Sequence, residues 1–244
     1  MGICSIKRSR VVSVRSCSIV TLTRPQPYLA MSYVWGPQRR ESVRLRSNVG
    51  AMLDMEHLPR TFKEVIQVTR ALAYDYLWVD AICIDQDDPD DRSALVGRMD
   101  LIYRGASLAI VAASGCDADH GLSGISKREP DRLVKLQWNT WSIEAPSLHD
   151  ALAKSVWSTR VWTFQEHVLS RACLYFRERE VFFRSPKQIF RESLGHDREI
   201  EQGLMGCKWL ASVQDQSFQR YAAAVKEYTC RNFTYRSDLS LIHI

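Results

Sequence analysis

The segment WSTRVWTFQEHVL, residues 157–169, combines aromatic rings and a carboxylate at helical spacing. Trp162 and Glu166 are four positions apart, so both side chains lie on the same side of a helix. The apolar residues recur on another face, which we expect to be the core face: Trp157, Val161, Phe164 and Val168. A carboxylate beside an indole, off the core but flanking a crevice, is suited to hold a sugar and stack a flat ring. The alternative is an exposed Glu166 with Trp162 packed under a neighbouring loop.

Polar residues and glycine also follow three predicted strands, at the point where each strand ends. The first strand ends in SYVWG (32–36), the second in DAICIDQ (80–86) and the third in SG (114–115). Ligands bind beyond the carboxyl ends of the strands in an open parallel sheet, so these residues are candidates for one crevice. Loops after strands are polar in most proteins, and Tyr33 and Trp35 also suit packing, so both interpretations stay open.

Other residue patterns lack the spacing that their chemistry requires. The acidic run DQDDPDD (85–91) has neither the central glycine nor the glutamate of a calcium loop. It is better explained as the solvated start of a helix, with Asp85 as a cap. His120 and His167 have no partner at metal-ligand spacing, so we expect no metal site. The chain has no Walker A sequence and no G-x-G-x-x-G, the common phosphate cradles.

The cysteines and charges limit the compartment and the partners. The seven cysteines are scattered without a C-x-x-C pair, which argues against a disulfide framework and indicates a reducing compartment, the cytoplasm. The first 50 residues hold nine Lys/Arg and one acid, whereas the rest of the chain holds 24 bases and 27 acids. Because the positive charge is at one end and not on the predicted domain, we expect no nucleic-acid partner. No apolar run approaches the roughly 20 residues of a membrane span.

Alternating strands and helices must position the candidate residues. Apolar and β-branched runs predict strands at 28–35, 76–84, 108–114, 172–176 and 181–184. Helical spacing predicts helices at 59–73, from the acidic run to about 103, at 158–169 and at 216–230. Residues 115–156 are predicted as an insertion with short strands. The alternation indicates an α/β protein with a parallel sheet, helices on both faces, an insertion and a C-terminal helical segment.

Five blocks of the chain, taken in order, resemble the fungal heterokaryon-incompatibility (HET) domain: YLAMSYVWG, LPRTFKEVIQVTRAL, YLWVDAICIDQDD, MDLIYRGASLAIVAASGCDADHGLSG and STRVWTFQEHVLSRACLYF. The resemblance covers about residues 28–184. Residues 1–27, rich in Ser, Arg and Val and without an acid, are expected to be a poorly ordered basic leader. Residues 185–244 are expected to be a C-terminal helical extension. Family members often continue beyond this point, so we expect the chain to be a fragment.

The resemblance implies a role in fungal non-self recognition, in which HET domains trigger programmed death of fused, incompatible cells. HET domains are distantly similar to Toll/interleukin receptor (TIR) domains, which are flavodoxin-like α/β modules, and several of these cleave NAD. Many TIR sequences carry W-C-x-x-E, and WTFQE (162–166) keeps this spacing with Thr at the cysteine position. The resemblance therefore implies Glu166 as the catalytic residue and Trp162 as a wall of the nicotinamide–ribose pocket. The other crevice residues that it implies are Ser32, Tyr33, Trp35, Gly36, Asp80, Asp85 and Gln86.

NAD is a substrate in this interpretation, and no cofactor is implied. Nicotinamide leaves as a neutral molecule from a cationic ring, so one carboxylate that stabilises the oxocarbenium-like transition state is enough. TIR-like enzymes generally assemble before they cleave, so self-association or an upstream recognition protein is expected. Two alternatives stay open: a non-enzymatic signalling module of the same fold, and a degenerate gene product without output.

Overall fold

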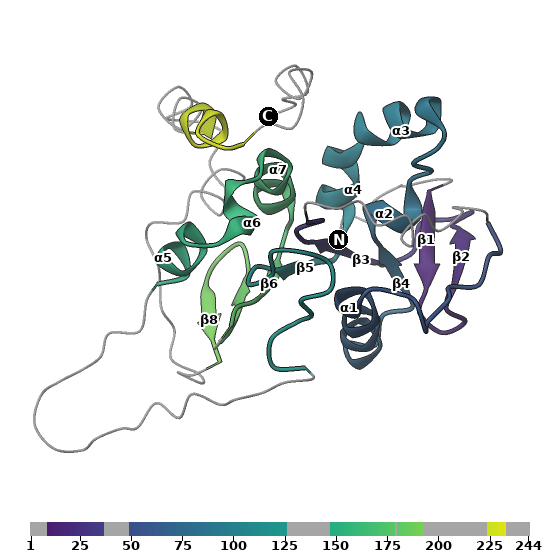
Figure 1. Ribbon diagram of the computed structural model, residues 1–244, viewed down its shortest axis with the longest axis horizontal. Coiled ribbons are helices and arrows are strands. Elements are labelled where there is room, and N and C mark those ends of the chain that lie inside the picture. The colour runs from purple at the N-terminus through teal and green to yellow at the C-terminus, as the bar shows by residue number, and fades with distance from the viewer. Residues whose placement is uncertain (1–8, 37–48, 126–146, 179, 193–223, 233–244) are drawn as a thin grey trace, which may run out of the picture.

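Eight strands form one sheet in the part of the chain that the computed structural model describes, which is residues 9–36, 49–125, 147–178, 180–192 and 224–232. The order across the sheet is β2-β1-β4-β3-β5-β6-β7-β8 (Figure 1). The strands are β1 (Arg10–Ser13), β2 (Ser18–Thr21), β3 (Leu29–Ser32), β4 (Tyr76–Trp78), β5 (Leu108–Ala112), β6 (Cys173–Phe176), β7 (Val181–Arg184) and β8 (Ile189–Arg191). The helices are α1 (Arg60–Ala71), α2 (Asp80–Cys83), α3 (Pro89–Val96), α4 (Met99–Gly105), α5 (Leu148–Ala153), α6 (Val156–Thr159) and α7 (Val161–Leu169), and residues 224–229 are also helical.

The centre of the sheet is parallel and its two edges are antiparallel. β3 pairs with β4 and β5, and β5 pairs with β6, all in parallel. The chain leaves β3 for β4 on one side and then crosses to β5 on the other side, so the connections diverge between β3 and β5. Such a switch point opens a crevice at the carboxyl ends of the two strands. Ser32 is the last residue of β3 and pairs with Val111 of β5, so it lies at this position.

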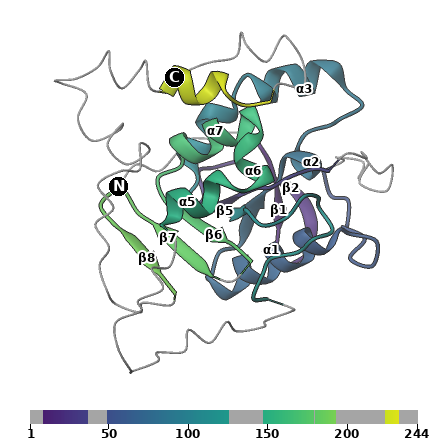
Figure 2. The same ribbon diagram turned by 60° about the vertical axis from the view of Figure 1, so that its left-hand side comes forward.

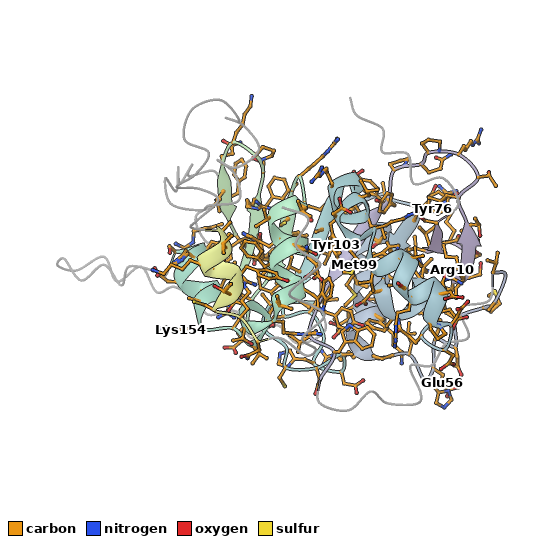
Figure 3. All side chains as sticks on the ribbon, turned by 90° about the horizontal axis from the view of Figure 1, so that it is seen from above. Arg10, Glu56, Tyr76, Met99, Tyr103 and Lys154 are labelled. Carbon is orange, nitrogen blue, oxygen red and sulfur yellow. The ribbon has the colours of Figure 1, made fainter. Side chains whose placement is uncertain are left out.

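Helices cover both faces of the sheet, as the alternation predicts. Figure 1 and Figure 2 show α1 on one side, and α4, α6 and α7 on the other. α4 packs against α7, and Figure 3 shows Met99 and Tyr103 of α4 near the middle of the molecule. All four residues of β3 are buried, and the central strands provide most of one large apolar core. The prediction of a mixed α/β protein is therefore confirmed.

Several elements agree with the sequence pattern. α1 spans most of the predicted 59–73 helix, with Pro59 directly before it and Phe62, Val65 and Ile66 buried. β5, β6 and β7 lie within the predicted strands. The acidic run begins a helix as expected, but the cap of α3 is Asp88 and not Asp85: Asp88 accepts hydrogen bonds from the N–H groups of Asp90 (3.0 Å) and Asp91 (3.3 Å).

The prediction of a poorly ordered leader at 1–27 is wrong for residues 10–21. β1 and β2 form an antiparallel hairpin, and β1 pairs with β4 at the edge of the sheet. Val12 and Ile19 of this hairpin are fully buried. The basic residues that suggested a solvated tail have acidic partners far along the chain: Arg10 bonds Asp91, and Arg15 bonds Asp75. Residues 1–8 lie outside the described residues.

The predicted parallel sheet is found only at the centre of the observed sheet, and several predicted elements are shorter than expected or divided. The predicted 76–84 strand ends at Trp78, and Asp80–Cys83 form the short helix α2. The Asp80 Oδ1 atom accepts a hydrogen bond from the N–H of Ala81 at 2.7 Å, which favours this turn over an extended chain. The helix predicted to reach residue 103 is divided into α3 and α4, and the 158–169 helix is divided at Arg160 into α6 and α7.

The predicted insertion is partly described. Residues 115–125 form turns and bends in place of the predicted short strands, and α5 lies within 147–156. Residues 126–146 lie outside the described residues, as do residues 216–223 of the predicted 216–230 helix. The structure describes residues 224–230 of the predicted helix, and 224–229 are helical.

The loop after β5 is fastened to the first turns of α1. The Thr61 N–H donates to the Ala118 carbonyl (3.1 Å), and the Gly121 N–H donates to Thr61 Oγ1 (2.9 Å). Glu64 is buried, pairs with Arg60 at 2.7 Å and accepts from the N–H of Leu122. Because the chain is so close to these side chains at Gly121, a Cβ atom there would lie 2.8 Å from Glu64 Oε2 and 2.9 Å from Arg60 Nε.

We expect the substitution Gly121→Ala to lower the free energy of unfolding by about 2–4 kcal/mol, because a positive φ of +88° and a steric clash act together. Gly124→Ala is the matched control: its φ is +91°, but a Cβ atom there meets nothing within 4 Å. This control is expected to cost about 1 kcal/mol. Urea unfolding of the three proteins measures both effects, and equal losses for the two variants would contradict the fastening of this loop.

Candidate active site

Glu166 and Ser32 meet at the carboxyl end of β3, although they are far apart in the chain. The Ser32 hydroxyl donates a hydrogen bond to Glu166 Oε2. Ser32 itself accepts one from the indole Nε1–H of Trp157 at 2.7 Å. Ser32 is 0% exposed, Trp157 1% and Glu166 6%, so α6 and α7 bring a closed polar cluster onto the end of the strand.

A second group of polar and aromatic side chains adjoins this cluster. The Trp35 Nε1–H donates to Asp80 Oδ2 at 2.7 Å, and Asp80 is also hydrogen-bonded to Tyr33. The rings of Tyr33 and Trp35 are stacked with 6.3 Å between centroids and 10° between planes. Arg160, at the break between α6 and α7, donates through Nη1 to the carbonyl of Tyr33 at 3.1 Å. The ends of β3 and β4 are thus joined to α7 through side chains.

Burial raises the pKa of Glu166 to about 7, and the negative charge of Asp80 acts in the same direction. The hydrogen bond from Ser32, the charge of Arg160 and a hydrogen bond from Tyr103 oppose this rise in the pKa. A carboxyl group with such a pKa exists in both protonation states near neutral pH, as general acids and bases often do.

The neighbouring groups are also shifted by burial. Burial raises the pKa of Asp80, against the opposing effects of Trp35, Arg160 and Tyr33. Burial also raises the pKa values of Tyr33 and Tyr103 well above their ordinary range. Both phenols therefore stay protonated at neutral pH and can act as hydrogen-bond donors.

The structure brings five of the predicted site residues into one connected group: Ser32, Tyr33, Trp35, Asp80 and Glu166. Gly36 follows this group with a φ of +90°, and a Cβ atom at Gly36 would lie 2.7 Å from Asp117 Cβ. Glycine is required here because the loop after β5 passes so close.

Three predicted residues lie at the margin of the group. Gln86 reaches Asp80 by its side-chain nitrogen, which lies 3.5 Å from the Asp80 carbonyl oxygen. Asp85 accepts a hydrogen bond from the N–H of Asp87 at 3.1 Å, which shapes the turn before α3. Trp162 is half-buried and packs against both the main core and the small cluster formed with residues 224–232.

The expected core face of the 158–169 helix needs correction. Val161, Phe164 and Val168 do not face the sheet but pack against Ala224 and Tyr228 of the C-terminal segment. Trp157 alone of the predicted face belongs to the main core. Glu166, expected off the core, is buried because α7 is covered on both sides: by the sheet and α4 on one, and by residues 224–232 on the other.

Sequence reasoning missed three residues that contact the site. Trp157 was assigned to packing by its spacing, although its Nε1–H requires a polar partner when it is buried. Tyr103 stands at the end of the helix predicted from the acidic run, where spacing gives no sign that its hydroxyl donates to the Met31 carbonyl at 2.8 Å and interacts with Glu166. Arg160 stands two residues before Trp162, so the nearness of a basic residue to the WTFQE segment was the available signal.

Two further findings concern the described residues. Among them, no three His, Cys, Asp or Glu side chains are grouped closely enough to hold a metal ion. In the same part of the chain, every helix is too short or too polar to cross a bilayer.

The raised pKa of Glu166 makes stability depend on pH. Unfolded glutamate ionises near pH 4.3, whereas the folded protein holds the Glu166 proton up to about pH 7. The folded state therefore binds more protons between these values, so the stability that this group contributes is present in acid and lost as the pH rises.

We expect Glu166→Gln, which stays neutral, to gain about 2–3 kcal/mol in the free energy of unfolding relative to the wild type between pH 5 and pH 8. Urea unfolding at both pH values measures this difference. Glu56→Gln is the control, because Glu56 is an exposed carboxylate at the periphery of the molecule (Figure 3). A difference that does not change with pH would show that the Glu166 pKa is not raised.

Comparison with known proteins finds a family that matches this chain. The family described as "Heterokaryon incompatibility protein (HET)" matches residues 28–166, which is more than half of the chain. "Heterokaryon incompatibility protein 6, OR allele" of Neurospora crassa is 34% identical over 106 residues. The match covers 39% of this chain but 16% of that relative, so the chain spans a small part of the relative's length. No solved structure matches the chain.

The family match begins at Tyr28, just before β3, and ends at Glu166. It therefore includes both partners of the Ser32–Glu166 hydrogen bond. The chain belongs to the heterokaryon incompatibility (HET) family.

Proposed function

We propose that this protein acts in heterokaryon incompatibility as an effector of cell death, and that it does so by cleaving NAD at the nicotinamide–ribose bond. The observation that carries the proposal is the position of Glu166, which lies against Ser32 at the switch point between β3 and β5. The printed name of the relative, a heterokaryon incompatibility protein, supports the biological role. The cytoplasm is the proposed compartment, and the five described cysteines are free thiols.

The strand order supports a flavodoxin-like, TIR-like fold. The parallel strands β4, β3, β5 and β6 follow the chain order second, first, third, fourth. This is the order of the first four strands in flavodoxin-like sheets, whose ligands bind at the switch point. The antiparallel hairpins β1–β2 and β7–β8 are additions at the two edges of this arrangement.

The chemistry that we assign to Glu166 requires its ionised form. A carboxylate next to the ribose stabilises the positive charge that develops as nicotinamide leaves, and a site that excludes water strengthens this interaction. A pKa of about 7 leaves a substantial ionised fraction at neutral pH. The stacked rings of Tyr33 and Trp35 offer a flat aromatic edge close to this carboxylate.

The described state is closed, which gives partners a role. Glu166 is 6% exposed and Ser32 is fully buried, so NAD must displace side chains before it reaches the carboxylate. We propose that self-association, or contact with an upstream recognition protein, stabilises an opened form. A ligand or partner shifts such an equilibrium only by its differential affinity for the two states.

The same burial favours a second function. A glutamate that is already bonded to Ser32 and enclosed by Trp157 can serve to hold α7 on the sheet. In that case the protein is a non-enzymatic module that recruits partners through its surface. The enzymatic function predicts that the clustered protein consumes NAD, whereas the non-enzymatic function predicts that the NAD level stays unchanged.

The test is to enforce clustering of the protein through a fused oligomerisation tag and to follow NAD and nicotinamide. We expect NAD loss by the wild type and a fall of about 100-fold or more in Glu166→Gln, because the variant lacks the charge that stabilises the transition state. Glu56→Gln is the control and should keep full activity, since it removes an exposed carboxylate elsewhere.

Two outcomes would overturn the enzymatic proposal. One is NAD loss that persists in the Glu166→Gln protein. The other is killing of cells by the clustered Glu166→Gln protein without NAD depletion, which would favour recruitment.

A further inference from the structure

We propose that Trp157 is a positioning residue of this site, whose indole N–H fixes the direction of the Ser32 hydroxyl and thereby prepares Glu166 to act as a carboxylate. The Trp157 Nε1–H donates a hydrogen bond to Ser32 Oγ, and the Ser32 hydroxyl donates one to Glu166 Oε2. The catalytic consequence rests on the proposed function, whereas the effect on the ionisation of Glu166 does not.

The direction of these two hydrogen bonds follows from donor chemistry. An indole nitrogen donates and never accepts, so Ser32 must accept the bond from Trp157. The single hydroxyl proton of Ser32 is then available for Glu166, which is an acceptor when ionised. Both Trp157 and Ser32 are at most 1% exposed, so bulk water does not compete for these bonds.

The fold holds Trp157 by its backbone carbonyl and by two contacts to its ring. The Thr163 hydroxyl donates to the Trp157 carbonyl at 2.7 Å, which ties α6 to α7. Trp157 also packs edge to face against His167, with 6.1 Å between centroids, and against Tyr175, at 6.3 Å. A ring fixed in this way keeps its N–H aimed at Ser32 without an ordering cost during the reaction.

Other charged and titratable groups act on Glu166 directly. They come from the elements packed around it, and they are Tyr33, Asp80, Tyr103, Arg160 and Arg231. Asp80 favours the neutral acid, whereas Arg160 and Tyr103 favour the carboxylate. Trp157 differs from these groups because it acts through the Ser32 hydroxyl.

The two hydrogen bonds from Trp157 to Ser32 and from Ser32 to Glu166 favour the ionised form of Glu166. A hydroxyl whose oxygen already accepts a bond is polarised and becomes a better donor to a carboxylate. Without the indole N–H, the Ser32 hydroxyl can turn and accept the proton of neutral Glu166. The loss of Trp157 should therefore stabilise the neutral acid relative to the carboxylate.

The experiment measures the Glu166 pKa by carbon-13 NMR of labelled glutamate carboxyls, with the signal assigned through Glu166→Gln. We expect Trp157→Phe to raise the pKa by about 0.5–1 unit, the size of one neutral hydrogen bond. Ser32→Ala should raise it at least as much. In the Ser32→Ala background, Trp157→Phe should have no further effect, because Trp157 acts through Ser32.

The control is Tyr28→Phe, which removes a buried hydroxyl that donates to the Ile102 carbonyl at 2.6 Å and takes no part in the hydrogen bonds from Trp157 to Glu166. It should lower the melting temperature and leave the Glu166 pKa unchanged. If Trp157→Phe fails to fold, benzothienylalanine at position 157 keeps the two fused rings and lacks the N–H. It should raise the pKa by the same amount.

The pH profile of NAD cleavage gives an independent readout. Activity should rise as Glu166 ionises, and Trp157→Phe should move this acid limb to higher pH by the same shift as in NMR. An unchanged pKa, or an equal shift with and without Ser32, would overturn the positioning role. If neither the wild type nor any variant cleaves NAD, the proposed function fails. The Glu166 pKa values of the variants, measured by NMR, still decide the role of Trp157.

Discussion

The structure depends on a carboxyl group placed where water cannot reach it. Glu166 lies at the end of β3 under α7, and burial would make its ionised form costly without partners. The protein meets this cost in two ways. The pKa of Glu166 rises to about 7, so the carboxyl group can be neutral. When the carboxylate forms, Ser32, Tyr103 and Arg160 stabilise it. The packing of α4 against α7 brings Tyr103 and Glu166 together.

The burial that raises the pKa of this carboxyl group also keeps molecules in the solvent away from it. Opening the site means moving α7, and α7 is held from outside as well. Arg231 donates to the Arg160 carbonyl at 3.3 Å and to Thr163 Oγ1 at 3.1 Å, and its guanidinium lies 5.0 Å from the Phe164 ring centre. A form in which α7 moves away from both the sheet and residues 224–232 must therefore break contacts on both sides of this helix. Assembly with another molecule is a physical means to offset such a cost, because new contacts can favour the opened form.

The sequence predicts the elements whose signals are local. α1 and β5 were predicted because apolar spacing and β-branched runs report burial within a few residues. The hairpin of β1 and β2 was missed because its basic residues looked solvated, and Arg10 finds Asp91 only after folding. The end of β4 at Trp78 was missed for a related reason: the apolar run continues, but Asp80 bonds the next N–H and turns the chain. Non-local pairing and local side-chain bonds both override a periodic pattern.

In the candidate site, too, some residues could be predicted from the sequence and others could not. The strand ends predicted Ser32 at the crevice, because the ends of parallel strands share one edge, whereas the position of Glu166 beside it was implied only by the family resemblance. Trp157 could not be predicted as a site residue, since periodicity treats a tryptophan as an apolar surface and ignores its one polar bond. The predicted core face of α7 is buried, but most of it packs against the C-terminal segment, and the opposite face with Glu166 is buried as well, because this helix is covered on two sides. The residue that periodicity assigned to packing thus donates to the same hydroxyl that binds Glu166, so packing and chemistry here belong to one side chain.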